Sequence, residues 1–226
     1  MKFTSIAAAA LLAVSSLAQA STQTVNFGPA TLSYSDSSVF GGLSQTSSSS
    51  TSYGFEWTVP SSVQVTSFGT LQMLDVALPS FTLSANTGYT LNGVLSGFLG
   101  NLAYTEVGGS TTGILAYADI AVNGGPAMSW SDGVGWTSTN SGPGYNIGYF
   151  AGTLSQSFGA FQSVTISNAH IVLSATGGTF SNISANPQNK LHIEFQAAAV
   201  PEPETYAMLL AGLGVVGFLA RRRKQA

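Results

Sequence analysis

Residues 164–173 read Val-Thr-Ile-Ser-Asn-Ala-His-Ile-Val-Leu, and this stretch decides the fold class. Apolar and polar side chains alternate in it with a period of two, which is typical of a half-buried strand and not of a helix. Counting by twos from Val164 places Ile166 on the same face of this strand. The same count places Ile171 and Leu173 on the opposite face.

Two further stretches show the same alternation. In residues 191–195, Leu191, Ile193 and Phe195 share one face, and the two residues between them are charged or titratable. In residues 114–122, every second residue on one face is Ile, Ala or Val. Strands therefore recur along the chain, and no long helical period appears between the two termini.

The composition between these strands favours tight turns. Ser, Thr, Gly and Asn are abundant, and Asn-Gly and Asp-Gly pairs tolerate the positive φ angles that hairpins need. The expected turns are Asn86-Thr87-Gly88, Asn92-Gly93, Gly108-Gly109, Asn123-Gly124-Gly125-Pro126, Asp132-Gly133, Gly142-Pro143-Gly144 and Thr176-Gly177-Gly178. The run Ser44 to Ser52 has no apolar surface to bury, so we expect a flexible loop there. Many short strands and frequent turns predict an all-β fold, an antiparallel sandwich or jelly roll.

The chain of 226 residues divides into three parts. Residues 1–20 combine Lys2, an apolar run and the small-x-small site Ala18-Gln19-Ala20, which is typical of a secretory signal peptide. Residues 21–199 form the predicted β domain, and residues 200–226 form a separate tail. A body of this length can bury a full core without disulfides, and the chain has no cysteine.

The charge of the body excludes one class of partner. Lys190 is the single basic residue between Ser21 and Val200, and seven acidic residues face it, which leaves a net charge of −6. Such a domain cannot neutralise a row of phosphates, so we expect no nucleic-acid binding.

Candidate catalytic and metal-binding residues are few. His170 and His192 lack the spacing of a zinc site, so we interpret both as structural. A glycoside hydrolase would need two facing carboxylates, for which Asp119 and Asp132 are the candidates, although Asp132 also suits a turn. A calcium site would use these two residues with Asn123, but the usual calcium-loop motif is absent. We therefore expect no catalytic activity, no metal and no cofactor.

Aromatic residues offer one binding hypothesis. Trp130 and Trp136 stand close together in the sequence, with Tyr145 and Tyr149 shortly after. Flat rings beside hydroxyl and amide groups could stack on sugars, as in a carbohydrate-binding module. The alternative, which we favour, is that Trp57 and these two tryptophans fill the core.

The tail has three consecutive parts. Pro201-Glu202-Pro203 predicts an extended strut, because proline lacks an N–H group and fixes φ. Tyr206 to Ala220 carries no charge and predicts a single transmembrane helix, although its length of about 22 Å falls short of a hydrocarbon core of about 30 Å. Arg221, Arg222 and Arg223 form the basic end, which stays cytoplasmic by the positive-inside rule.

This order of strut, apolar helix and arginine cluster resembles the PEP-CTERM sorting domain, a substrate of the membrane-embedded cysteine protease exosortase. The resemblance covers the tail alone. It implies export through the Sec translocon, transient anchoring in the inner membrane, and processing near Pro-Glu-Pro. It also implies a final location at the cell surface or in the extracellular matrix of Gram-negative bacteria that make exopolysaccharide, with a role in biofilm. The bodies of such proteins are diverse, so the tail implies an address and not an activity.

Overall fold

The computed structural model describes residues 21–35, 40, 42–47, 49, 51–186, 188–201 and 203–223. The expected signal peptide at residues 1–20 lies outside this part. The described part contains strands β1 (Thr22–Asn26), β2 (Ala30–Ser35), β3 (Leu43–Ser47), β4 (Ser52–Thr58), β5 (Gln64–Ala77), β6 (Phe81–Ala85), β7 (Tyr89–Val107), β8 (Ser110–Val122), β9 (Met128–Thr139), β10 (Tyr145–Phe161), β11 (Ser163–Ser184) and β12 (Lys190–Ala199), and helix α1 (Pro203–Arg223).

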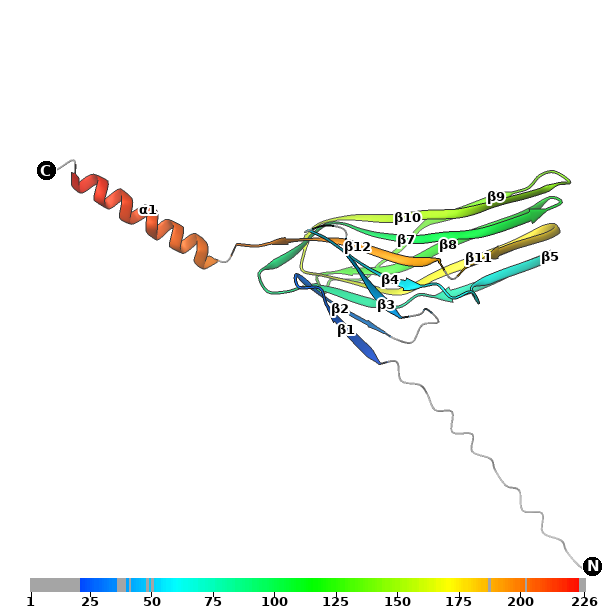
Figure 1. Ribbon diagram of the computed structural model, residues 1–226, viewed down its shortest axis with the longest axis horizontal. Coiled ribbons are helices and arrows are strands. Elements are labelled where there is room, and N and C mark those ends of the chain that lie inside the picture. Colours follow the sequence, from blue (N-terminus) through cyan, green and yellow to red (C-terminus); the bar gives the residue numbers. More distant parts are fainter. Residues whose placement is uncertain are drawn as a thin grey trace, which may run out of the picture.

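The strands form two antiparallel sheets that run along the long axis of the molecule (Figure 1). One layer has the strand order β10-β7-β12-β4-β3, and the other has β9-β8-β11, with β5 and β6-β2-β1 on the far side of β11. The layers join at one end, where Phe180–Ser184 of β11 pairs with Ala103–Val107 of β7. The all-β, antiparallel prediction is therefore confirmed.

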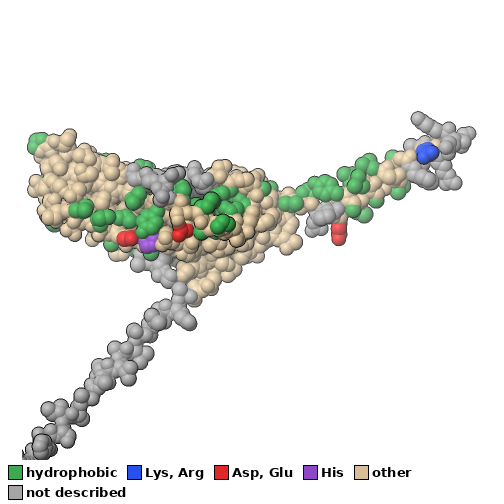
Figure 2. Space-filling view, turned by 180° about the vertical axis from the view of Figure 1, so that it is seen from behind, with side chains coloured by type: hydrophobic (Ala, Val, Ile, Leu, Met, Phe, Trp, Pro, Cys, Tyr) green, Lys and Arg blue, Asp and Glu red, His purple; other side chains and the backbone are tan. Residues whose placement is uncertain are grey.

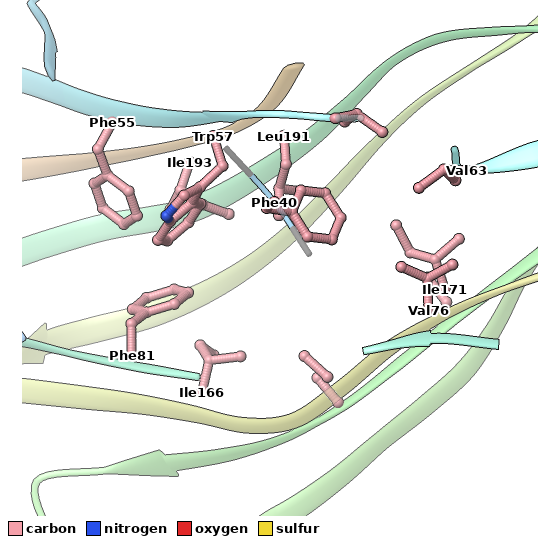
Figure 3. Close-up of a cluster of buried hydrophobic side chains, with 14 of the residues drawn as sticks. Phe40, Phe55, Trp57, Val63, Val76, Phe81, Ile166, Ile171, Leu191 and Ile193 are labelled. Carbon is pink, nitrogen blue, oxygen red and sulfur yellow. The ribbon is translucent and has the colours of Figure 1, made fainter. Parts of the chain in front are cut away.

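The core lies between the two layers. Figure 3 shows Phe55 and Trp57 on one side of the core, facing Phe81 and Ile166 on the other. The Phe55 ring meets the Trp57 ring edge-on at 5.2 Å between centroids, and the Phe81 ring edge-on at 5.4 Å. Such edge-to-face pairs add to the stabilisation from burying apolar area. Trp57 is 2% exposed, so the prediction that it fills the core is confirmed.

In strand β11, residues 164–173 do not follow the strict alternation that the sequence predicts. Val164, Ile166, Ile171 and Leu173 are all buried in the one core, so the prediction that they lie on opposite faces is wrong. The reason is a β-bulge at Asn168, which has a φ of 48° and lies where the register with β8 shifts. One extra residue in a strand exchanges the faces of every residue that follows.

The faces expected for the other two stretches are confirmed. Leu191, Ile193 and Phe195 of β12 are buried, and so is every second residue from Ile114 to Ile120 in β8. Neither stretch contains a bulged residue of its own, so counting by twos stays in phase.

Several expected turns lie inside long strands instead. Asn92-Gly93 lies within β7, Asp132-Gly133 within β9, and Gly177-Gly178 within β11. Gly177 and Gly178 do have positive φ angles, of 74° and 61°, but they lie where the pairing of β11 shifts register. The predicted loop at Ser44 to Ser52 is also partly wrong, because β3 pairs with β4 there.

The expected helix of the tail is present as α1. No helix in the described part of the chain combines the length and the apolar character that a membrane crossing needs. The predicted helix is therefore present, but the prediction that it spans a membrane is not supported.

Candidate functional site

The two tryptophans of the proposed sugar platform lie on β9. Trp130 pairs with Ala118 of β8, and Trp136 pairs with Ile114. Both partners are buried, and both tryptophans are half-buried and packed against the core. Both tryptophans therefore contribute to the hydrophobic core, although neither is fully buried.

The two tyrosines of the platform lie on β10, in the other layer. Tyr145 is 77% exposed and Tyr149 is 65% exposed, and Ile147 between them is exposed as well. These three residues alternate along one outward face of β10. The structure thus separates the four aromatic residues into an inner pair and an outer pair.

A cavity of about 240 Å³ lies beside Trp130, at the middle of β8. Both neighbours of β8 are irregular at this level. On one side, two residues of β11, Asn168 and Ala169, oppose the single residue Ala118. On the other side, residues 131–133 of β9 oppose the single residue Tyr117. Bulges redirect side chains and open the hydrogen-bonded ladder, which explains why the surface is hollowed here.

Asp119 is the central polar group of this cavity. Its Oδ1 accepts a hydrogen bond from the Ser129 hydroxyl at 2.7 Å, and its Oδ2 accepts one from the Asn168 amide at 3.3 Å. All three residues line the cavity. An ionised carboxylate offers about four acceptor sites, so these two bonds fix the carboxylate and leave room for further donors.

A second polar group adjoins the cavity on the same face of the sheet. Asp75 of β5 lies 2.7 Å from Nδ1 of His170, and it accepts a hydrogen bond from the Tyr117 hydroxyl at 3.4 Å. The Tyr117 and His170 rings stack at 5.0 Å with an interplanar angle of 6°. Figure 2 shows a face on which acidic and histidine side chains lie close together among hydrophobic side chains.

The phenol of Tyr117 keeps its proton over a wide pH range. Loss of hydration, and then the neighbouring negative charge of Asp75 and its hydrogen bond, raise the pKa of Tyr117 above its ordinary value. Tyr117 therefore remains a hydrogen-bond donor at physiological pH.

Among the described residues, the structure does not bring the candidates for catalysis and calcium binding together into one site. Asn123 Oδ1 accepts hydrogen bonds from the backbone N–H groups of Gln162 and Ser163, which makes Asn123 a turn residue. The side chain of Asp132 lies outside the described part. No group of three His, Asp or Glu side chains that could hold a metal ion occurs among the residues described.

His192 lies in a small charged cluster on the opposite layer. Its Nδ1 is 3.9 Å from the Glu56 carboxylate, and Lys190 Nζ is 3.7 Å from the same carboxylate. The cluster joins β4 to β12. It places the one basic residue of the body away from the cavity at Asp119.

Glu106 is a polar residue that no sequence motif singles out. It is fully buried, and its carboxylate accepts hydrogen bonds from Thr112, Ser138 and Asn146. These partners come from β8, β9 and β10. The group is a structural link between four strands and not an open site.

The tail begins where the sheet ends. Strand β12 stays paired with β7 up to Ala199, opposite Tyr89, and the N–H of Val200 then donates to the carbonyl of Gly88 at 2.8 Å. Helix α1 begins at Pro203, and it projects away from the sheets (Figure 1). A groove of about 720 Å³ lies at this junction, between the β6–β7 turn and the first residues of the tail.

Residues 199–224 match the PEP-CTERM protein-sorting motif. The match starts at the last residue of β12 and includes all of α1. No curated protein matches the chain. The resemblance seen in the sequence is thus shown, and it is confined to the tail.

The PEP-CTERM segment marks the chain as an exported protein that exosortase sorts to the cell surface or the extracellular space. Of its expected signature residues, Pro201 is exposed just after the sheet, Pro203 opens α1, and Arg221, Arg222 and Arg223 close it. Glu202 lies outside the described residues.

Proposed function

We propose that the protein is an exosortase-processed component of the cell surface or extracellular matrix, without catalytic activity. The observation that carries this proposal is the PEP-CTERM segment joined directly to a folded β body. The Sec translocon would export the chain, the inner membrane would hold it briefly, and exosortase would release the body.

The composition of the body supports a place among extracellular polysaccharide. Its net charge of −6 keeps copies apart in solution, and its many Ser, Thr and Asn side chains offer hydrogen bonds to a hydrated polymer. A role in biofilm and association with exopolysaccharide are part of this proposal.

Intact-mass analysis of the secreted protein tests the proposal. In an exosortase-competent host, we expect the loss of Met1 to Ala20 and of the segment after about Pro203. A matched strain without exosortase should retain the tail. If Arg221 to Arg223 remained on the secreted protein in both strains, processing would be excluded.

A carbohydrate-binding module is the second candidate. The exposed Tyr145 and Tyr149 on β10, and the hollow beside Trp130 on β9, each offer aromatic surface near polar groups. The third candidate, a glycoside hydrolase that uses Asp119 or Asp132, has no described geometry in its favour.

A further inference from the structure

We propose that the cavity between β8, β9 and β11 binds a neutral polysaccharide, with Asp119 and Asn168 as its polar contacts and Tyr117 and Leu115 as its apolar walls. The inference rests on the proposed extracellular function and names both the site and the class of ligand. It differs from the aromatic platform expected from the sequence, because it excludes Tyr145 and Tyr149 on the other layer.

The first argument is the way the cavity is built. Two bulges open the sheet on either side of Tyr117 and Ala118 at the same level. The bulge in β11 holds Asn168 at a φ of 48°, which a residue other than glycine adopts at a cost. Asn168 uses that conformation to reach Asp119, and both line the cavity.

The second argument is the mixture of surfaces around the cavity. Sugar rings have apolar faces and hydroxyl edges, so a site for them needs flat apolar walls and fixed hydrogen-bond partners. The Tyr117 ring, which stacks on the His170 ring, supplies one wall. Leu115, which is 42% exposed, adds apolar surface beside it. Asp119 supplies acceptors for hydroxyl groups, and bonds to a charged acceptor are stronger than neutral ones.

The third argument is charge, which determines the kind of polysaccharide. Asp75 and Asp119 lie on this face, and the single basic residue of the body, Lys190, lies with Glu56 on the other layer. Uronate, sulfate or phosphate groups would meet these two carboxylates without a lysine or arginine beside them, because Lys190 is the one such residue of the body. A ligand without charged groups avoids this repulsion.

The size of the cavity sets the length of chain that it holds. Its volume of about 240 Å³ lies below the range of about 300–1,000 Å³ that is typical of sites for whole small molecules. The site therefore takes one or two sugar rings of a longer polymer, with the rest of the polymer outside. Binding at each site is weak, because one or two sugar rings bury little surface.

Affinity electrophoresis of the full chain tests this inference. The gels would contain dextran, a soluble mixed-linkage β-glucan or galactomannan as neutral probes, and alginate or polygalacturonate as anionic probes. We expect at least one neutral polymer to retard the protein and neither anionic polymer to do so. Asp119→Ala and Asn168→Gly should each raise the dissociation constant obtained from the retardation by about tenfold or more, because each removes a hydrogen-bonding group that faces the ligand.

The variants include their own controls. Asn168→Gly is compatible with the positive φ, so it removes the amide without straining the bulge. Tyr149→Ala removes an exposed aromatic residue from the other layer and should leave the retardation unchanged. The melting temperature of each variant, measured in the same buffer, shows that the fold is intact.

Three results would overturn the inference. The first is the absence of retardation by every neutral probe. The second is loss of retardation in Tyr149→Ala with retention in Asp119→Ala, which would place the site on β10. The third is loss of binding on addition of EDTA, which would assign recognition to a bound cation. None of these results affects exosortase processing, which the masses of the secreted protein test separately.

Discussion

Thr112 donates both its backbone N–H, at 3.0 Å, and its hydroxyl, at 2.7 Å, to the same carboxylate oxygen of Glu106, and neither residue has exposed surface. The other oxygen of Glu106 accepts from Ser138 at 3.0 Å and from Asn146 at 2.9 Å. This buried carboxylate therefore holds together β7, β8, β9 and β10 near the end where β7 meets β11. A buried polar group of this kind stabilises the fold if all its partners are present.

Glu106→Ala is expected to destabilise the protein by about 3 kcal/mol or more. It leaves the Thr112 donors buried without an acceptor, and each unpaired buried group costs about 1–3 kcal/mol. Glu106→Gln should cost less, because it keeps one acceptor but turns an NH₂ group towards Asn146. Urea denaturation measures both. Glu56→Ala, which removes a partly exposed ion pair, is the control and should cost about 1 kcal/mol or less.

Gly178→Ala should destabilise the protein strongly. Gly178 has a φ of 61°, and an added Cβ would lie 2.7 Å from the carbonyl oxygen of Gly108 and closer still to that of Val107. A left-handed conformation and a collision with backbone together should cost about 2 kcal/mol or more. Gly159→Ala is the matched control, since a Cβ there meets nothing within 4 Å. Equal melting temperatures for the two variants would contradict this prediction.

Asn168→Val should destabilise the protein by about 1–2 kcal/mol, because a β-branched side chain is strained at a φ of 48°. Asn168→Gly should change the free energy of unfolding by less than about 0.5 kcal/mol, since glycine accepts this conformation freely. Ser167→Val, next in the chain but before the bulge, controls for the added apolar surface. Thermal unfolding of the three variants separates backbone strain from side-chain chemistry.

The bulge at Asn168 also explains what could be predicted of the fold from the sequence. The alternation around Val164 and around Leu191 indicated strands, and the strands are present. The faces of Ile171 and Leu173 could not be predicted, because no residue type marks a bulge reliably and Asn is equally common in turns. The same ambiguity placed turns at Asn92-Gly93 and at Asp132-Gly133, inside long strands.

The candidate site was predictable in its parts but not in its assembly. Trp130 is a candidate for stacking on sugars and Asp119 a candidate carboxylate of a hydrolase, and both line the cavity. The contributions of Tyr117, Ser129 and Asn168 depend on the pairing of β8 with two different strands. Pairing between strands far apart in the sequence leaves no local signal. The tail is the opposite case, because its order of residues is itself the signal.

Tyr117 should titrate at a higher pH than an ordinary tyrosine side chain. Loss of hydration and the charge of Asp75 raise its pKa above the ordinary value of 10.0. Because the folded pKa is the higher one, the resulting stabilisation is complete below pH 10 and declines as the pH rises above the unfolded value.

NMR titration of the tyrosine rings measures this difference. Asp75→Asn should lower the pKa of Tyr117 while leaving it above the ordinary value, since the loss of hydration remains. Tyr145→Phe assigns one of the exposed signals and should leave the Tyr117 titration unchanged. Titration of Tyr117 at the ordinary value of 10.0 would contradict the contribution of Asp75 and of the lost hydration.

The junction between β12 and α1 predicts that release by exosortase is limited by access. Ala199 is still paired with Tyr89, and α1 begins at Pro203, so residues 200–202 span at most about 11 Å. A protease needs several residues of extended chain, and the hydrogen bond from Val200 to Gly88 restricts them further. Cleavage near Pro-Glu-Pro would therefore require the end of β12 to separate from β7.

Insertion of Gly-Ser-Gly-Ser between Val200 and Pro201 should accordingly speed processing several-fold, because it supplies extended chain without opening the sheet. A pulse-chase measurement of tail loss in an exosortase-competent host gives the rate. The same insertion between Gly142 and Pro143, in the turn before β10, is the control and should leave the rate unchanged. If both insertions processed at the rate of the native chain, the end of β12 would not limit access, and exosortase would have to cut within α1 or act before the sheet is complete.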